Sequence, residues 1–153
     1  LRDAEPGEEE INFADRGEQL TRYSRALKVW LSVNYFGTEA IAVAIADAMD
    51  RARLGQSLVE ASSYLEVLSP AQLGIVCFRA RPANVADSDL DSFNERVNAR
   101  VVAGGKFFIS STRLRGIFSL RMCTLGFRTT TDDIRSLFST VEQAVDAELA
   151  AGG

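Results

Sequence analysis

Hydrophobic side chains recur every three or four residues in two consecutive segments near the start of the chain. Residues 16–37 are expected to form a connecting helix, because their apolar positions fall on one stripe. The stripe consists of Leu20, Tyr23, Leu27, Trp30 and Leu31. Gly37 is expected to end this helix, and residues 38–61 continue the same periodicity in a second helix. Residues 1–15 are acidic and contain proline and glycine, which is typical of a linker.

Strand-like patterns replace the helical period after residue 61. The predicted strands cover residues 64–68, 73–79, 106–112 and 117–123. A break is expected at Pro70, which separates the first two strands. Residues 73–79 are almost continuously apolar, which suits a strand covered on both faces. The last two strands are expected to form an antiparallel hairpin whose loop around Gly116 is longer than two residues.

Two further helices complete the pattern. One follows the capping residues at positions 87–89 and carries Leu90, Phe93, Val97 and Val101 before the glycines at 104 and 105. The other follows a threonine- and aspartate-rich start at residues 129–133 and carries apolar residues as far as Leu149. The order helix, helix, two strands, helix, two strands, helix predicts an α+β domain over residues 38–150. In this fold class, helices would pack on a mostly antiparallel sheet of about four strands.

Composition narrows the chemistry. The chain has 153 residues, 46% of them hydrophobic and 25% charged, with a net charge of −4. It contains no histidine, which excludes His-containing triads and His-ligated metal sites. We therefore expect no catalytic residue and no metal site in this stretch. The weakly acidic, scattered charge argues against nucleic-acid binding. No uninterrupted apolar run approaches the length of a membrane helix, so no membrane contact is expected.

The two cysteines indicate the compartment. Cys77 and Cys123 lie in strand-like segments and do not form a CxxC motif. Buried free thiols of a cytoplasmic protein are the preferred interpretation, and a disulfide is the alternative. The start of the chain also lacks the basic and apolar regions of a signal peptide.

Several segments resemble a known family. The segments GEQLTRYSRALKVWLSVNYFG, LGIVCFR and GKFFISSTRLRGIFSLRMCTLGFRTT occur in this order. They resemble the C-terminal part of group II pyridoxal-phosphate-dependent amino-acid decarboxylases, such as the aromatic-amino-acid and glutamate decarboxylases. The resemblance implies the small domain of a fold-type I enzyme, with residues 1–15 leading from a missing large domain.

The resemblance also implies where the chemistry lies. In this family, pyridoxal 5'-phosphate is attached to a lysine that directly follows a histidine, and neither Lys28 nor Lys106 has that context. The cofactor would therefore be bound by the missing large domain of the full-length enzyme, and this stretch alone is expected to bind none and to be inactive. The family also implies a homodimer and a small amino-acid substrate. Many aromatic-type members of the family carry two consecutive arginines at the position where this chain has Arg22 followed by Tyr23. The identity of the substrate amino acid therefore stays open.

Four cations are candidate site residues. Arg121 lies on a largely apolar predicted strand, where an unpaired guanidinium is costly to bury. It matches the arginine that holds the substrate carboxylate in glutamate-decarboxylase-like members, and a salt bridge inside the domain is the equal alternative. Arg22, Arg25 and Lys28 are expected at the interface with the large domain, and simple surface positions are their alternative. A rival hypothesis for the whole chain is a free-standing α+β binding or dimerisation module without catalysis.

Overall fold

The computed structural model describes residues 23–151. Along these residues the chain forms α1 (Arg25–Ala61), β1 (Leu65–Gln72), β2 (Ile75–Ala80), the short 3₁₀ helix η2 (Asp87–Asp89) and α2 (Leu90–Ala103). It continues with β3 (Ser110–Leu114), β4 (Ile117–Cys123) and α3 (Thr131–Ala151). The four strands form one antiparallel sheet in the order β1-β2-β4-β3. The predicted α+β class and the four-stranded sheet are confirmed.

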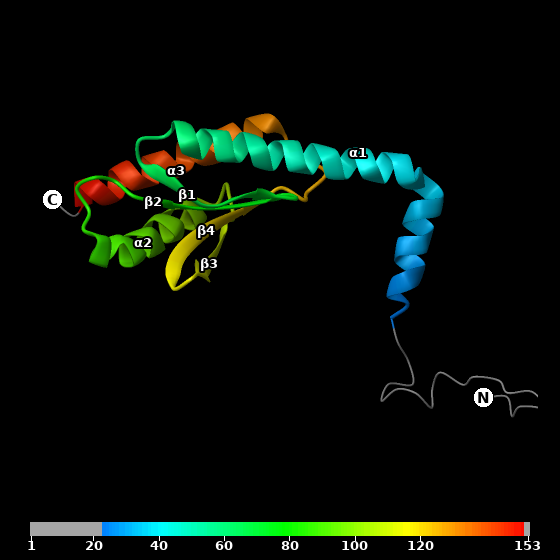
Figure 1. The fold of residues 1–153 in the computed structure, drawn as a ribbon, viewed down its shortest axis with the longest axis horizontal. Helices are drawn as coiled ribbons and strands as arrows, with labels where there is room; N and C mark the ends of the chain where they lie inside the picture. The colour runs from blue at the N-terminus through cyan, green and yellow to red at the C-terminus, as the bar shows by residue number, and fades with distance from the viewer. Residues whose placement is uncertain (1–22, 152–153) are drawn as a thin grey trace, which may run out of the picture. The chain divides into compact units, whose positions relative to one another are not determined.

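One face of the sheet forms the hydrophobic core with the helices. The β4 side chains Phe118, Leu120 and Met122 point to this face and belong to one buried cluster with residues of all three α-helices. The Phe78 ring of β2 lies 5.1 Å from the Phe138 ring of α3. Figure 1 shows α3, in orange and red, beside residues 39–61 of α1. Side chains of opposite parity on the strands, Arg121 among them, lie on the other face, which we call the open face.

Gly37 interrupts α1 as the sequence predicts. Its φ and ψ are 78° and 158°, so two helical segments meet there at a kink. The chain divides into two units after Thr38. The first segment begins at Arg25, and residues 23 and 24 are not helical. The predicted start at residue 16 and the linker over 1–15 lie outside the described residues.

One helix of the described residues, α1, is long and apolar enough to cross a membrane by length and composition. An 18-residue window within it has a mean hydropathy of 1.4. The sequence analysis looked only for an uninterrupted apolar run and missed this window. No residue of that window is buried in the structure. The fully buried Ala52 and Val59 of α1 therefore lie outside it. A core helix of a soluble protein can have a similar length and composition.

Three predicted strand details are wrong. The β3–β4 loop has only two residues, because Leu114 pairs with Ile117. Arg115 and Gly116 have φ values of 51° and 86°, and positive φ at both turn positions gives the tight turn that matches strand twist. Pro70 does not end β1, since an edge strand tolerates a proline and absorbs it by shifts in register. The strand predicted from residue 106 begins at Ser110, because the preceding chain turns toward α3, where Lys106 Nζ donates to Ser136 Oγ.

The predicted start of α3 is confirmed at atomic detail. Asp133 accepts hydrogen bonds from the Thr130 backbone N–H and hydroxyl, both at 2.8 Å. The Asp133 N–H in turn donates to Thr130 Oγ1 at 3.2 Å. This reciprocal pattern is a capping box, and it fixes where the last helix begins. It also lowers the pKa of Asp133, because both bonds stabilise the ionised carboxyl.

Candidate functional site

Arg121 lies in the interior strand β4, directly between a residue of β2 and a residue of β3. Its cross-strand partners are Cys77 on one side and Ser110 on the other. Directly opposed residues of paired strands point to the same face. Arg121 is therefore flanked on the open face by a thiol and a hydroxyl, and its side chain is exposed.

Among residues 23–151, Arg121 has small, uncharged neighbours on its own strand. Along β4, the neighbours on the same face are Ser119 and Cys123, which are also small and uncharged. Within residues 23–151, no carboxylate lies within ion-pair distance of Arg121. The sequence analysis offered a salt bridge inside the domain as the alternative to substrate binding by Arg121. Among the described residues, Arg121 forms no salt bridge.

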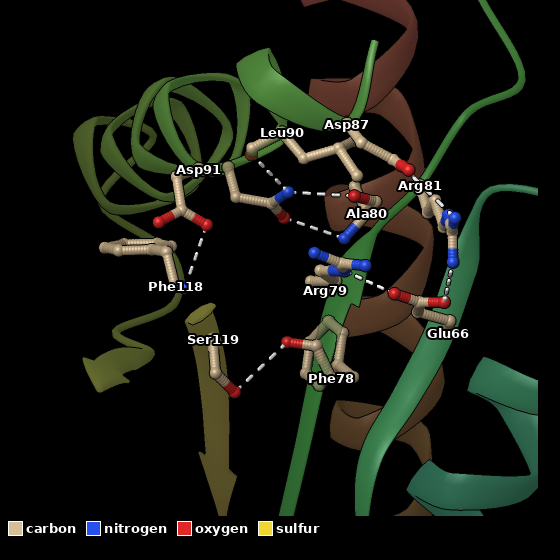
Figure 2. Close-up of polar contacts among 11 residues, drawn as sticks. Glu66, Phe78, Arg79, Ala80, Arg81, Asp87, Leu90, Asp91, Phe118 and Ser119 are labelled. Atoms are coloured by element: carbon tan, nitrogen blue, oxygen red, sulfur yellow. Dashed lines mark hydrogen bonds and ion pairs between the residues drawn. The ribbon is translucent and has the colours of Figure 1, made fainter. Parts of the chain in front are cut away.

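A second arginine on the same face shows the contrast. Arg79 of β2 forms an ion pair with Glu66 of β1, and Arg81 adds a second bond to the same carboxylate at 3.2 Å (Figure 2). The Arg79 side chain is only 12% exposed. Its charge is neutralised within the sheet, which is the ordinary structural use of an arginine in a folded domain. In the part of the chain that the structure describes, the charge of Arg121 has no such partner.

Ser110 of β3 contacts the Arg121 guanidinium. Arg121 Nε donates to Ser110 Oγ at 3.0 Å. The Ser110 hydroxyl in turn donates to the Arg121 carbonyl oxygen at 3.3 Å. No bond to the two Nη groups is recorded among the described residues. The sequence analysis missed Ser110, because only the β3–β4 register places it opposite Arg121.

A cleft of about 320 Å³ lies between the chain before β3 and the start of α3. Its walls include Lys106, Arg128 and Asp133, and Cys123 from the end of β4. Lys106 is already bonded to Ser136 Oγ at 2.7 Å, and Asp133 is committed to the helix cap. Lys106 and Asp133 are therefore engaged by the fold itself, and the Arg128 guanidinium lies 5.3 Å from the centre of the Phe127 ring. The sequence analysis did not single it out.

Several longer proteins have sequences and folds similar to those of this chain. No family model matches it. The aromatic-L-amino-acid decarboxylase of Bacillus atrophaeus is 34% identical over 93% of the chain, and tyrosine decarboxylase 2 of Arabidopsis thaliana is 35% identical over 72%. The solved structure of Oryza sativa TDC with PLP and tryptamine superposes with a TM-score of 0.80 over 89% of the chain, at 24% identity.

The chain is homologous to group II pyridoxal-phosphate-dependent amino-acid decarboxylases. It spans 30% of the Bacillus relative, 20% of the Arabidopsis relative and 29% of the rice structure. The resemblance read from the sequence is thereby confirmed over most of the chain. The coverage also fits a large domain outside this stretch.

The described residues do not form the decarboxylase family's attachment site for pyridoxal phosphate. The chain has two lysines and no histidine. Lys106 is bonded to Ser136, and Lys28 lies with its Nζ 5.6 Å from the centre of the Tyr23 ring. Neither lysine has the preceding histidine that the resemblance implies for the attachment site.

Two of the three expected interface cations lie in the first segment of α1. Arg25 and Lys28 are exposed, and neither forms an ion pair among the described residues. Arg22 lies outside those residues. Their role at a contact with the decarboxylase large domain therefore stays a prediction.

Proposed function

We propose that the complete protein is a pyridoxal-phosphate-dependent decarboxylase that releases CO₂ from an L-amino acid and leaves an amine. This chain would be its small domain, and Arg121 would bind the substrate carboxylate. Homology to named decarboxylases over 93% of the chain supports the reaction class. The Arg121 guanidinium, exposed on the open face and without an ion pair among residues 23–151, is the observation that carries the site assignment.

Arg121 suits this role because a guanidinium presents paired N–H groups to the two oxygens of a carboxylate. Pyridoxal phosphate, when bound, accepts the electrons left behind as CO₂ departs. The task of Arg121 is then to hold the carboxyl group in the orientation from which it leaves. The contact must not stabilise the bound substrate more than the transition state, since uniform binding does not raise kcat. An exposed guanidinium with one fixed nitrogen meets that requirement better than a buried ion pair.

We further propose that the complete enzyme is a cytoplasmic homodimer. Family resemblance supports the dimer. Cys77 and Cys123 are both free cysteines, which supports a reducing compartment. Cys77 is buried as expected, but Cys123 is exposed, so the expectation of two buried thiols is wrong for Cys123. The large domain of the complete enzyme would be contacted by Arg22, Arg25 and Lys28.

The test is to express the complete coding region that contains this chain, supply pyridoxal phosphate and offer a panel of L-amino acids. We expect one class of amino acid to give its amine and CO₂ in equal amounts. The chain of 153 residues alone, treated with pyridoxal phosphate and borohydride, should show no stoichiometric labelling of one lysine. Cofactor-loaded complete protein that forms no amine from any amino acid would contradict the proposal and favour a binding module.

A further inference from the structure

We infer that Ser110 is a positioning residue that sets the direction from which Arg121 receives a carboxylate. The inference rests on the proposed function, because it assigns Ser110 a role through the Arg121 guanidinium. Ser110 itself would not touch the substrate. Its two hydrogen bonds to Arg121, at 3.0 Å and 3.3 Å, carry the argument.

The Ser110 hydroxyl is used as donor and acceptor at once. The Ser110 O–H donates to the Arg121 carbonyl oxygen, and a lone pair of Oγ therefore accepts the hydrogen bond from the Arg121 Nε–H. The backbone register holds Ser110 opposite Arg121. The hydroxyl therefore has a fixed orientation, and it fixes the guanidinium plane in turn.

This bond selects one of two ways in which a guanidinium can bind a carboxylate. A carboxylate can approach side-on, at Nε and one Nη, or end-on, at the two Nη groups. Ser110 occupies Nε, so only the end-on edge is available for a bidentate contact. The small neighbours Cys77, Ser119 and Cys123 do not compete for that edge with a charge.

Fixing the Arg121 side chain before the carboxylate binds also lowers the entropic cost of binding. A free arginine has several rotatable bonds, and ordering them on binding opposes affinity. Ser110 orders the guanidinium through a neutral contact that leaves its charge available. A carboxylate at that position, such as Glu66 beside Arg79, would order the side chain and neutralise it as well.

The experiment compares variants of the complete, cofactor-loaded protein. Ser110→Ala removes both hydrogen bonds, and we expect kcat/KM for the amino acid to fall about 3- to 10-fold, the effect of one hydrogen bond. Ser110→Thr keeps the hydroxyl and should restore most of the activity. Ser111→Ala is the matched control, because Ser111 is exposed on the same strand, opposite Leu120 rather than Arg121. It should behave as the wild type.

Two readouts separate positioning from a general structural effect. Product inhibition by the amine, which has lost the carboxyl group, should be unchanged in Ser110→Ala. In an Arg121→Met background, Ser110→Ala should have no further effect, because the residue through which it acts is absent. Melting temperatures of all variants are measured alongside.

The failures are distinguishable. If the Arg121→Met variant is as active as the wild type, the assignment of Arg121 is wrong, and the role of Ser110 falls with it. If Arg121→Met is impaired while Ser110→Ala is normal, or loses the same factor in both backgrounds, Ser110 does not act through Arg121. In that case the proposed function stands and this inference is overturned.

Discussion

Arg121 is the residue whose replacement best tests the assignment. Arg121→Lys retains the positive charge and loses the pair of parallel N–H donors. We expect kcat/KM of the complete enzyme to fall about 10-fold or more, which corresponds to about 1.4 kcal/mol of transition-state stabilisation. Arg121→Met, similar in length but uncharged, should lose more, because the electrostatic attraction to the carboxylate also disappears.

The structure sets a small stability cost for the same variants. Arg121 is exposed and has no ion pair among the described residues, and its side chain makes one recorded hydrogen bond, to Ser110. Losing that bond costs about 0.5–1.5 kcal/mol at most. The shift per kcal/mol is smaller in larger proteins, so we expect the melting temperature of the complete enzyme to fall by no more than about 5 °C.

Arg79→Met is the matched control on the same face of the sheet. The Arg79 side chain is 12% exposed, and its partner Glu66 is 29% exposed. Breaking a fully buried pair costs about 3–5 kcal/mol. Because Arg81 still contacts Glu66 in the variant, we expect a smaller loss of about 2 kcal/mol, estimated from that range. The two arginines should therefore show opposite effects: Arg121 variants lose turnover, and Arg79→Met loses stability.

The assay is steady-state kinetics of the complete enzyme together with thermal unfolding of each variant. An Arg121→Met protein with a greatly lowered melting temperature and normal kcat/KM would refute the reasoning. That result would mean that Arg121 stabilises the fold through a partner outside residues 23–151. A kinetic loss in Arg79→Met equal to that in Arg121→Met would show that any change to the open face impairs activity.

Three further predictions concern the fold. The guanidinium of Arg100, and then that of Arg96, hold the pKa of Glu148 below its ordinary value. Glu148 therefore stabilises the fold above its unfolded pKa, and this contribution is lost as pH falls through the folded pKa. Glu148→Gln should lower the free energy of unfolding by about 1–2 kcal/mol at neutral pH, with a difference from the wild type that shrinks on acidification in urea titrations. Gly116→Ala should lower the free energy of unfolding by about 1–2 kcal/mol in the same urea titrations, because φ is 86° at this position. An unchanged midpoint of urea unfolding would contradict the two-residue turn. The aromatic side chains of Trp30, Tyr35 and Phe36 are 60%, 83% and 62% exposed. The chain expressed alone should therefore bind a hydrophobic dye, or self-associate in sedimentation experiments. A monomer that binds no dye would argue against an interface at these residues.

The sequence by itself determined the types of the elements and their order. In β4, Phe118, Leu120 and Met122 alternate with Ser119 and Arg121, and the predicted bounds Ile117–Cys123 are those observed. The start of α3 followed from the threonine- and aspartate-rich run at residues 129–133, and the structure identifies Thr130 and Asp133 as the capping pair. Gly37 marked the interruption of the first helix. These features depend on interactions within a few residues, which a local pattern records completely.

The tertiary structure decided everything that depends on which strands are neighbours. The sequence placed Arg121 on a strand and could not choose between a salt bridge and a ligand site. The order β1-β2-β4-β3 puts Cys77 and Ser110 beside Arg121 and brings Glu66 to Arg79 instead. The same pairing lets β1 continue through Pro70 as an edge strand. In the β3–β4 hairpin, the register follows from the two-residue turn, which the sequence analysis predicted to be longer. The pairing of β2 with β4 joins segments far apart in the sequence, so no window along the chain contains it.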